Sequence, residues 1–257
     1  MRKQVISVWF SCGAASATAA MLTKLKYGAT HKIRVLNNPV IEEDDDNFRF
    51  LKDVEDWIGL PIETVKNFKF PNCSAVEVWD KRKFMSGPEG APCTLLLKKT
   101  ARYQFEMDND IDFHVLGFTK GEESRFIDFT KNERPNTIPV LIEEGFTKGD
   151  CFRYIQDAGI KLPNAYLQGY PNANCIGCPK ATSPTYWNHV RKMHPNVFKD
   201  RAEQSRRLGC RLVRYKGNRI YLDELPADAK GRPMKNLDFE CGIFCHTGKN
   251  HGHPDQR

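Results

Sequence analysis

Val5-Ile6-Ser7-Val8-Trp9-Phe10-Ser11-Cys12-Gly13-Ala14-Ala15-Ser16 is the stretch of this sequence that decides the fold. Its β-branched and aromatic first half predicts a buried strand, and the small residues after it predict a sharp turn. The alanines that follow are helix formers. A strand, a tight loop and a helix N-terminus together form an anion site, because unpaired N–H groups and the positive end of the helix dipole point into the loop. The same pattern also fits an ordinary first strand–helix turn of an α/β domain.

The spacing of the polar residues in this loop narrows the interpretation. Ser11-x-Gly13-x-x-Ser16 resembles the PP-loop of the ATP-pyrophosphatase superfamily, which is usually written Ser-Gly-Gly-x-Asp-Ser. That superfamily includes reductases of adenylyl sulfate and of phosphoadenylyl sulfate (PAPS), and ATP-dependent sulfurtransferases that thiolate tRNA. Here Cys12 replaces the first Gly, and Ala15 replaces the Asp that is expected to help handle magnesium in ATP-cleaving members. The change at Ala15 favours a nucleotide-binding reductase over an ATP-splitting enzyme.

Downstream of the loop, predicted strands alternate with predicted helices as far as about residue 160. Apolar residues recur at helical spacing after an acidic run at 42–46, and they predict a helix whose buried face holds Phe48, Leu51, Val54, Trp57 and Ile58. Thr147-x-x-Asp150 has the form of a capping box at the start of a later helix. Further strands are predicted over 32–40, 60–65, 111–118 and 137–142. The alternation predicts an α/β fold with a doubly wound, mostly parallel sheet, and the resemblance implies a HUP-like, PP-loop domain.

The alternation ends near residue 162, and a different organisation follows. Ser183-Pro184 predicts the start of a helix, 195–208 a second helix, and Lys216-Gly217-Asn218 the turn of a hairpin. The last twenty residues are expected to form a loose tail. The sequence therefore predicts a nucleotide-binding domain over 1–160 and a cysteine-containing helical and hairpin module over 161–257.

Composition and charge limit the function classes. The 257-residue chain has a net charge of +7 and no apolar run long enough to span a bilayer, and its N-terminus leads directly into a strand instead of a signal core. These features predict a cytoplasmic protein with no membrane partner. The charge gathers in the C-terminal half, where it is consistent with tRNA or DNA, a polyanionic nucleotide, an acidic protein, or simply a solvated face. The basic residues there are Arg191, Lys192, Lys199, Arg201, Arg206, Arg207, Arg211, Arg214, Lys216 and Arg219.

Nine cysteines are many for such a chain, and two pairs are closely spaced, Cys175/Cys178 and Cys241/Cys245. In a reducing compartment this usage indicates metal binding or redox chemistry. Cys-x-x-Cys is the common half-site for zinc and for iron–sulfur clusters, so either a structural zinc knuckle or a cluster fits the pair at 175.

The segments around that pair resemble the PAPS reductase family. Ile138-Pro139-Val140-Leu141, the helix beginning at Thr147 and the Gly177-Cys178-Pro179 end of the Cys-x-x-Cys segment follow the family's order. Pro92-Cys93 through Lys98 is similar to its Cys-x-x-x-x-Lys segment, and Gly117 to Arg125 to its Gly-x-Arg-x-x-Glu-Ser-x-x-Arg segment, with Thr119 replacing the first Arg. The resemblance spans about residues 4–182. It implies that nucleotide is bound by Ser11, Cys12, Gly13, Ala14, Ser16, Lys98, Glu123 and Arg125.

The resemblance also implies a metal centre with two assignments of its ligands. Cys93 precedes Cys175 by 82 positions, the spacing that adenylyl-sulfate reductases use for a [4Fe–4S] cluster, although Pro92 stands in place of one cysteine. Glu240-Cys241-Gly242-Ile243 is similar to the reductases' tail, whose cysteine attacks sulfur. In one assignment Cys241 is the nucleophile and Cys93, Cys175, Cys178 and Cys245 hold the cluster. In the other, Cys241 joins Cys175, Cys178 and Cys245 in a structural zinc or iron–sulfur site. A protein without metal is the third outcome.

Three functions follow from these expectations. The first is a PAPS reductase-like oxidoreductase, which would reduce the sulfate of an adenine nucleotide (PAPS or adenylyl sulfate) to sulfite through an S-sulfonate on Cys241, with a thioredoxin-type reductant. The second is an ATP- and magnesium-dependent iron–sulfur sulfurtransferase that thiolates tRNA or another nucleic acid. The third is a non-catalytic nucleotide- or nucleic-acid-binding protein with a structural metal. A second copy of the chain, in a homodimer, is a further partner that the resemblance implies.

Overall fold

The computed structural model describes residues 2–88 and 90–234, and its centre is a parallel β-sheet. Five strands lie in the order β3-β2-β1-β4-β5, and every neighbouring pair is parallel. This confirms the predicted α/β fold with a parallel sheet. The strands are β1 Val5–Phe10, β2 Lys32–Asn37, β3 Ile62–Thr64, β4 Phe113–Val115 and β5 Thr137–Ile138.

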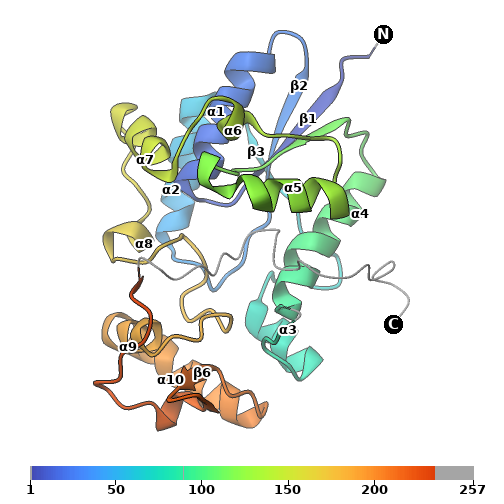
Figure 1. The fold of residues 1–257 in the computed structure, drawn as a ribbon. Coiled ribbons are helices and arrows are strands. Elements are labelled where there is room, and N and C mark those ends of the chain that lie inside the picture. The colour runs from blue at the N-terminus through green and yellow to red at the C-terminus, as the bar shows by residue number, and fades with distance from the viewer. Residues whose placement is uncertain (1, 89, 235–257) are drawn as a thin grey trace.

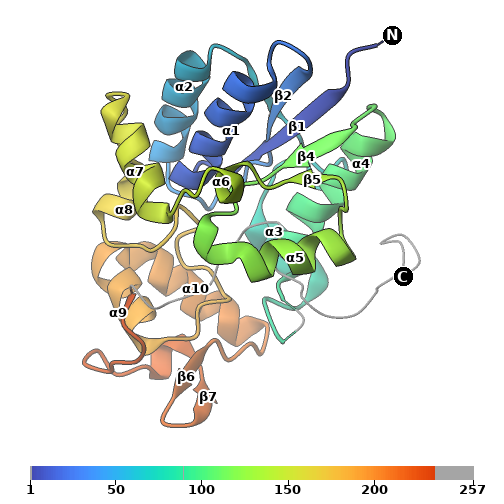
Figure 2. The same ribbon diagram turned by 45° about the horizontal axis from the view of Figure 1, so that its top comes forward.

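Helices cover both faces of this sheet (Figures 1 and 2). They are α1 Ala14–Tyr27, α2 Asp46–Ile58, α3 Ala75–Arg82, the π-helical η1 Thr94–Thr100, α4 Ala101–Met107, the 3₁₀ turn η2 Lys120–Glu122, α5 Glu123–Asn132, α6 Val140–Glu143, α7 Lys148–Asp157, α8 Asn164–Leu167, α9 Pro184–Met193, α10 Pro195–Arg207 and the 3₁₀ turn η3 Leu222–Glu224. None of the described helices is both long enough and apolar enough to cross a membrane.

The alternation of side chains along β1 explains how the two layers form. Ile6, Val8 and Phe10 point to one face and share a buried cluster with α1, α2 and α7. Trp9 points to the opposite face and packs with residues of α4 and α5. Successive side chains of a strand point to opposite faces, so a strand buried on both sides reads as a continuous apolar run.

Two local predictions were wrong. Phe48 is 71% exposed, whereas Phe50, which lies nearer the centre of the helix face that meets the sheet, is fully buried. The strand predicted over 137–142 ends at Ile138, because the chain turns at Pro139 into α6. Residues 75–82 form α3, whose start is capped by the Ser74 hydroxyl that accepts the backbone N–H of Glu77.

The C-terminal module follows the prediction more closely. Helices α9 and α10 occupy the expected segments, and a hairpin of β6 Val213–Tyr215 and β7 Asn218–Ile220 turns at Lys216-Gly217. The predicted tail over 238–257 lies outside the described residues, which end at 234. The domain boundary at 160 stays a prediction. One large apolar cluster draws on both sides of it, with Val78 and Trp79 from α3 and Tyr186 and Trp187 from α9.

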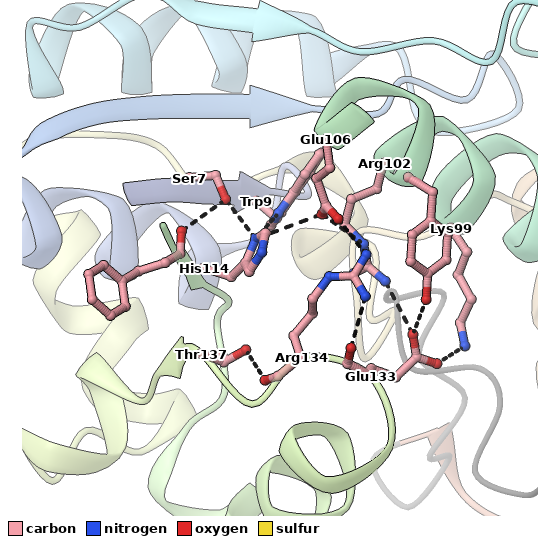
Figure 3. A network of polar contacts seen from close by, with 11 residues as sticks. Ser7, Trp9, Lys99, Arg102, Glu106, His114, Glu133, Arg134 and Thr137 are labelled. Carbon is pink, nitrogen blue, oxygen red and sulfur yellow. Dashed lines mark hydrogen bonds and ion pairs between the residues drawn. The ribbon is translucent and has the colours of Figure 1, made fainter. Parts of the chain in front are cut away.

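A buried polar network lies beneath β1 and β4, between the sheet and helices α4 and α5 (Figure 3). His114 Nδ1 is 2.8 Å from Ser7 Oγ and receives the indole N–H of Trp9 at 3.4 Å. Because an indole N–H is only a donor, Nδ1 carries no proton and the imidazole is neutral. Burial, with the positive charges of Arg102 and Arg134, lowers the pKa of His114 to about 3.

Candidate functional site

The main cavity lies where the order of the strands reverses. β1 is the central strand from which the chain runs first to β2 and later to β4, and parallel α/β sheets bind ligands at such a switch point, beyond the carboxyl ends of the strands. The cavity, of about 100 Å³, lies between the loop after β1 and the loop after β4. Its lining residues are Trp9, Ser11, Gly13, Ala15, Ser16, Leu116, Gly117, Thr119, Glu122, Lys148, Tyr166, Asn172, Ala173 and Asn174.

The loop after β1 is built to leave helix amides available to an anion. Gly13 is the N-cap of α1, no described side chain caps this end, and the first turn holds no acidic residue. The Ser16 hydroxyl donates to Gly13 O at 2.9 Å and accepts the Ser11 N–H at 3.1 Å, so it braces the loop. Amides of a first helical turn have no partner within the helix, and together with the helix dipole they favour phosphate or sulfate.

Cys12 has a structural role in this loop. Its φ is +56°, in the left-handed region that favours glycine, and this is the position at which the PP-loop pattern has its first Gly. The thiol is buried, and Asn37 Nδ2 donates to its Sγ at 3.6 Å. Burial, followed by the nearby Glu43 carboxylate, raises the pKa of Cys12 far above its usual value. Cys12 therefore stays a neutral thiol and is a packing residue, not a nucleophile.

Two glycines allow the cavity walls to come close together. A Cβ on Gly117 would lie 2.8 Å from Ser16 N and 3.0 Å from Ala15 C, so the end of β4 passes directly against the first turn of α1. A Cβ on Gly13 would lie 3.1 Å from the Tyr166 hydroxyl. The loop after β1 is therefore held between the chain at the end of β4 and Tyr166 of α8, at the start of the C-terminal module.

The charged residues of the cavity were not among those predicted. Glu122 lines it, and its carboxylate accepts Thr119 N–H at 3.1 Å, Thr119 Oγ1 at 2.9 Å and the guanidinium of Arg125. Lys148, at the start of α7, lines it too and donates to Pro171 O and Asn172 Oδ1, both at 2.6 Å. Glu123, which was predicted to bind the nucleotide, is exposed and does not line the cavity, although it is next to Glu122 in the chain.

Lys98 lies away from the cavity lining. Its ammonium is buried and sits 3.2 Å from Glu43 Oε1, close to Cys12 on the far side of the loop. Its assignment to the nucleotide stays a prediction, and so does that of Arg125, whose guanidinium pairs with Glu122. The acidic run that includes Glu43 is used structurally, because the Glu42 carboxylate accepts the N–H groups of Ala75 and Val76 at the start of α3.

The Cys-x-x-Cys segment is continuous with one wall of the cavity. Asn172, Ala173 and Asn174 line the cavity, and Cys175 is the next residue. Cys175 and Cys178 are buried, and the Cys178 N–H donates to the Tyr186 hydroxyl at 3.0 Å. Two hydrogen bonds hold the segment to the earlier part of the chain. The Ile176 N–H donates to Glu42 O at 3.0 Å, and the Ser86 hydroxyl donates to Pro179 O at 2.6 Å. The cavity and the pair of thiols are thus neighbours.

The surroundings of the two thiols fit an anionic centre. Arg201 is 95% buried, and burial lowers its pKa while the Glu42 carboxylate and, after it, Cys175 act in the opposite direction. Its Nη1 donates to Gln204 Oε1 at 2.5 Å, whereas its Nε has no hydrogen-bond partner within the described residues. Gly177 has φ +72°, and a Cβ there would come within 2.9 Å of Val197 Cγ1, so the loop closes tightly against α10. A buried arginine donor without a partner implies an acceptor beside it, and thiolates or a metal–sulfur group supply that chemistry.

The complete ligand set of a metal centre is not established by the described residues. Cys93 is buried in the same apolar cluster as Cys175 and Cys178. However, residues 2–88 and 90–234 contain no group of three or more His, Cys, Asp or Glu side chains placed to hold a metal ion. Cys241 and Cys245 lie outside those residues. The two four-ligand assignments, and the role of Cys241 as a nucleophile, therefore stay predictions.

The predicted basic surface is smaller than the sequence indicates. Arg206 pairs with Asp223 and Glu224 at 2.9 and 2.8 Å, and Arg207 pairs with Asp80 at 2.9 Å. Arg201 is buried. Sequence charge alone could not show this, because Asp80 is more than a hundred residues distant from Arg207.

Comparison with known proteins finds similarity among solved structures. No family model matches the chain, and no curated protein matches it. One of the solved structures that match is the U34-tRNA thiolase NcsA from Methanococcus maripaludis with its [4Fe-4S] cluster, at a TM-score of 0.46 and 13% sequence identity. The likeness covers 81% of this chain and 74% of that one.

Proposed function

We propose that the protein is an ATP-dependent sulfurtransferase that thiolates a base of a nucleic acid. The observation that carries the proposal is the shared wall, in which Asn172–Asn174 line the nucleotide pocket and lead directly into Cys175 and Cys178. Replacement of an activated oxygen by sulfur needs this arrangement, because the departing adenylate and the incoming sulfur must meet at one carbon atom.

The carboxylate of Glu122 supports ATP as the nucleotide. Ala15 leaves the phosphate loop without a carboxylate of its own, but Glu122 lines the same cavity from the other side. Magnesium is bound through one or two carboxylates together with substrate phosphates, so Glu122 is the residue that would hold it here. The same carboxylate accepts hydrogen bonds from Thr119 and pairs with Arg125, so a magnesium ion would share it with these donors.

In the proposed reaction the chain's own residues position two anions. The amides at the start of α1, with Ser11 and Lys148, bind the phosphates of ATP. A carbonyl oxygen of the base attacks the α-phosphorus of ATP, and pyrophosphate leaves. Sulfide sulfur then attacks the carbon that bears this oxygen, and AMP leaves with the oxygen. Cys93, Cys175 and Cys178 would hold a [4Fe–4S] cluster, and its fourth iron, without a cysteine ligand, would supply the site at which sulfur is carried.

The test is anaerobic purification followed by two assays. Incubation with bulk tRNA or DNA, ATP, Mg²⁺ and sulfide should give pyrophosphate and a thiolated nucleoside detectable by mass spectrometry. Cys175→Ser should abolish the thiolated product, while Cys210→Ser, at a half-buried cysteine of the same module, should retain it. Product from Cys175→Ser, or pyrophosphate release without Mg²⁺, would refute the proposal.

A sulfonucleotide reductase is the second candidate, and Ala15 is the observation that favours it. Ala15 lines the cavity at the position where the ATP-splitting pattern has its magnesium-handling Asp. A reductase would bind PAPS or adenylyl sulfate without Mg²⁺ and release sulfite when a thioredoxin-type reductant is added. Sulfite release that depends on Cys241 would replace the first proposal with this one.

A further inference from the structure

The β6–β7 hairpin carries the largest unneutralised group of positive charges that we find in the C-terminal module. Arg211, Arg214, Lys216 and Arg219 are all exposed along its two short strands and turn. Within the described part of the chain, none of the four forms an ion pair. This distinguishes them from Arg206 and Arg207 of α10, which pair with acidic residues. Figure 2 shows the hairpin at the end of the module that lies away from the parallel sheet.

The register of the hairpin places like charges face to face. Arg214 and Arg219 are directly opposite partners in the antiparallel pair. Like charges at opposed positions destabilise a β-ladder. Partial desolvation of the Arg219 side chain lowers the pKa of its guanidinium, and the positive charge of Arg214 makes a second, smaller contribution in the same direction. A free hairpin gains nothing from this pairing, whereas an anion lying across both guanidinium groups would remove the repulsion.

The hairpin is fixed to the segment that carries the cysteine pair. Leu212 and Val213 are buried in the module's apolar cluster. The Arg214 N–H donates to Thr182 O at 2.8 Å, four residues after Cys178. A ligand held by the hairpin is therefore in a defined position relative to the candidate sulfur site.

We propose that the β6–β7 hairpin binds the sugar–phosphate backbone of a nucleic acid. This inference rests on the proposed function, and it names the element that holds the acceptor. Arg214 in β6, Lys216 in the turn and Arg219 in β7 place three cations on one short element, and the backbone of a nucleic acid is a polyanion with a charge at every phosphate. Two-stranded ribbons of this kind are an established way to contact nucleic acid.

The chemistry of the hairpin argues against a membrane or an acidic protein as its partner. The hairpin is described in full, and none of the large exposed apolar side chains of the described residues lies on it. A helix or ribbon that inserts into a membrane interface needs apolar side chains beside its cations. The core of a protein–protein interface is likewise enriched in apolar and aromatic groups.

The test compares two double variants that remove the same charge. Arg214→Ala/Arg219→Ala removes the opposed pair of the hairpin, and Arg206→Ala/Arg207→Ala removes two ion-paired arginines of the same module. Binding of a fluorescein-labelled RNA duplex and of bulk tRNA is measured without ATP between about 50 and 200 mM salt. The hairpin variant should bind about tenfold or more weakly at the lowest salt, and the slope of log K against log salt should fall by about 1 for each cation removed. The control variant should keep the wild-type slope.

Folding of the variants is checked separately, because the Arg219 guanidinium also donates to Leu212 O at 3.0 Å. Arg214→Ala/Lys216→Ala, which keeps Arg219, should reproduce the loss of binding. Arg214→Ala alone should leave the melting temperature unchanged or raise it. Equal losses in hairpin and control variants, or an unchanged slope in both hairpin variants, would overturn the inference. So would hairpin-dependent binding of poly-glutamate or anionic vesicles as tight as that of RNA.

The outcomes separate this inference from the proposed function. Binding that depends on the hairpin, together with no thiolated nucleoside under any condition, would retain the hairpin as a nucleic-acid contact and reject the sulfurtransferase. A thiolated product from the hairpin variant at wild-type yield and wild-type tRNA affinity would retain the sulfurtransferase and reject the hairpin.

Discussion

Gly117 shows how a single residue sets the width of the candidate cavity. The backbone at the end of β4 passes so close to the first turn of α1 that a Cβ would lie 2.8 Å from Ser16 N and 3.0 Å from Ala15 C. Both contacts are with backbone atoms, which cannot rotate away as a side chain would. The glycine therefore allows the loop after β4 to form one wall of an anion site that the loop after β1 begins.

We predict that Gly117→Ala weakens nucleotide binding and lowers the free energy of unfolding by about 1–3 kcal/mol, the usual cost of overpacking. The loop must move away from α1, and its amides then lose their common direction. Urea unfolding and equilibrium binding of ATP or PAPS measure the two effects. Gly121→Ala is the matched control, since a Cβ there would meet nothing within 4 Å. Equal effects of the two substitutions would contradict the prediction.

Arg201 is the second residue with a defined expectation. Its buried charge interacts with Glu42 and, second, with Cys175, and its Nε has no partner among the described residues. We predict that Arg201→Met lowers the iron and sulfide retained per chain after anaerobic purification, because the positive charge that offsets the thiolates is lost. Arg207→Met, which removes an exposed charge of the same helix, should retain the wild-type iron content. Iron retention by Arg201→Met equal to that of Arg207→Met would show that Arg201 acts only in packing.

Elements were predicted from sequence where a local pattern determines them. The strand at Val5–Phe10, the capping box at Thr147 and the Ser183-Pro184 helix start all have chemistry that acts over a few residues. Phe48 was misplaced because its helical spacing is as good as that of Phe50, and only the sheet beneath decides between them. Local pattern is therefore reliable for where an element begins and less so for which side it buries.

The candidate site was predicted only in part, for the same physical reason. Ser11, Gly13 and Ser16 share one loop, so their spacing shows that they act together. Glu122, Lys148 and Tyr166 come from three other elements and meet at the cavity only in the folded chain. The Gly117–Arg125 segment did indicate a glutamate, but Glu122 and Glu123 are adjacent and only the backbone direction distinguishes them.

The network between β4 and helices α4 and α5 predicts how stability depends on pH (Figure 3). The pKa of His114 is lowered to about 3 in the folded protein, whereas an unfolded histidine has a pKa of about 6.5. The unfolded chain therefore binds a proton that the folded chain refuses. The free energy of unfolding is therefore unaffected by protonation of His114 above about pH 6.5, and it falls by about 1.4 kcal/mol per pH unit as the pH decreases toward 3.

We predict that His114→Gln removes this slope. Urea unfolding of wild type and variant between about pH 6.5 and 4.5 isolates the histidine, because carboxylates such as Asp112, whose pKa is lowered by the Val5 N–H, titrate in the unfolded chain only near pH 4. The difference in unfolding free energy between the two proteins should shrink steadily over this range. Parallel stability curves for the two proteins would contradict the lowered pKa.

At the scale of the whole molecule, the question is whether the sheet and the C-terminal module unfold together. The largest apolar cluster contains Val78 and Trp79 from α3 as well as Trp187 and Val190 from α9. The cysteine segment is tied to the earlier chain by the backbone of Glu42 and by Ser86. A module that shares its core with the preceding domain loses most of its apolar contacts if either part opens alone, so cooperative unfolding is expected.

We predict that Val190→Ala, at a fully buried position of α9, lowers the opening free energy of amides in β1 by as much as that of amides in α9. The loss should be about 1–3 kcal/mol, the scale for deleting buried methyl groups. Hydrogen exchange followed by mass spectrometry measures both segments in the full chain. Lys192→Ala, at an exposed position of the same helix, should change neither. A loss confined to α9 would instead support two independently stable units divided near residue 160, because the sheet would then keep its protection while the module opens.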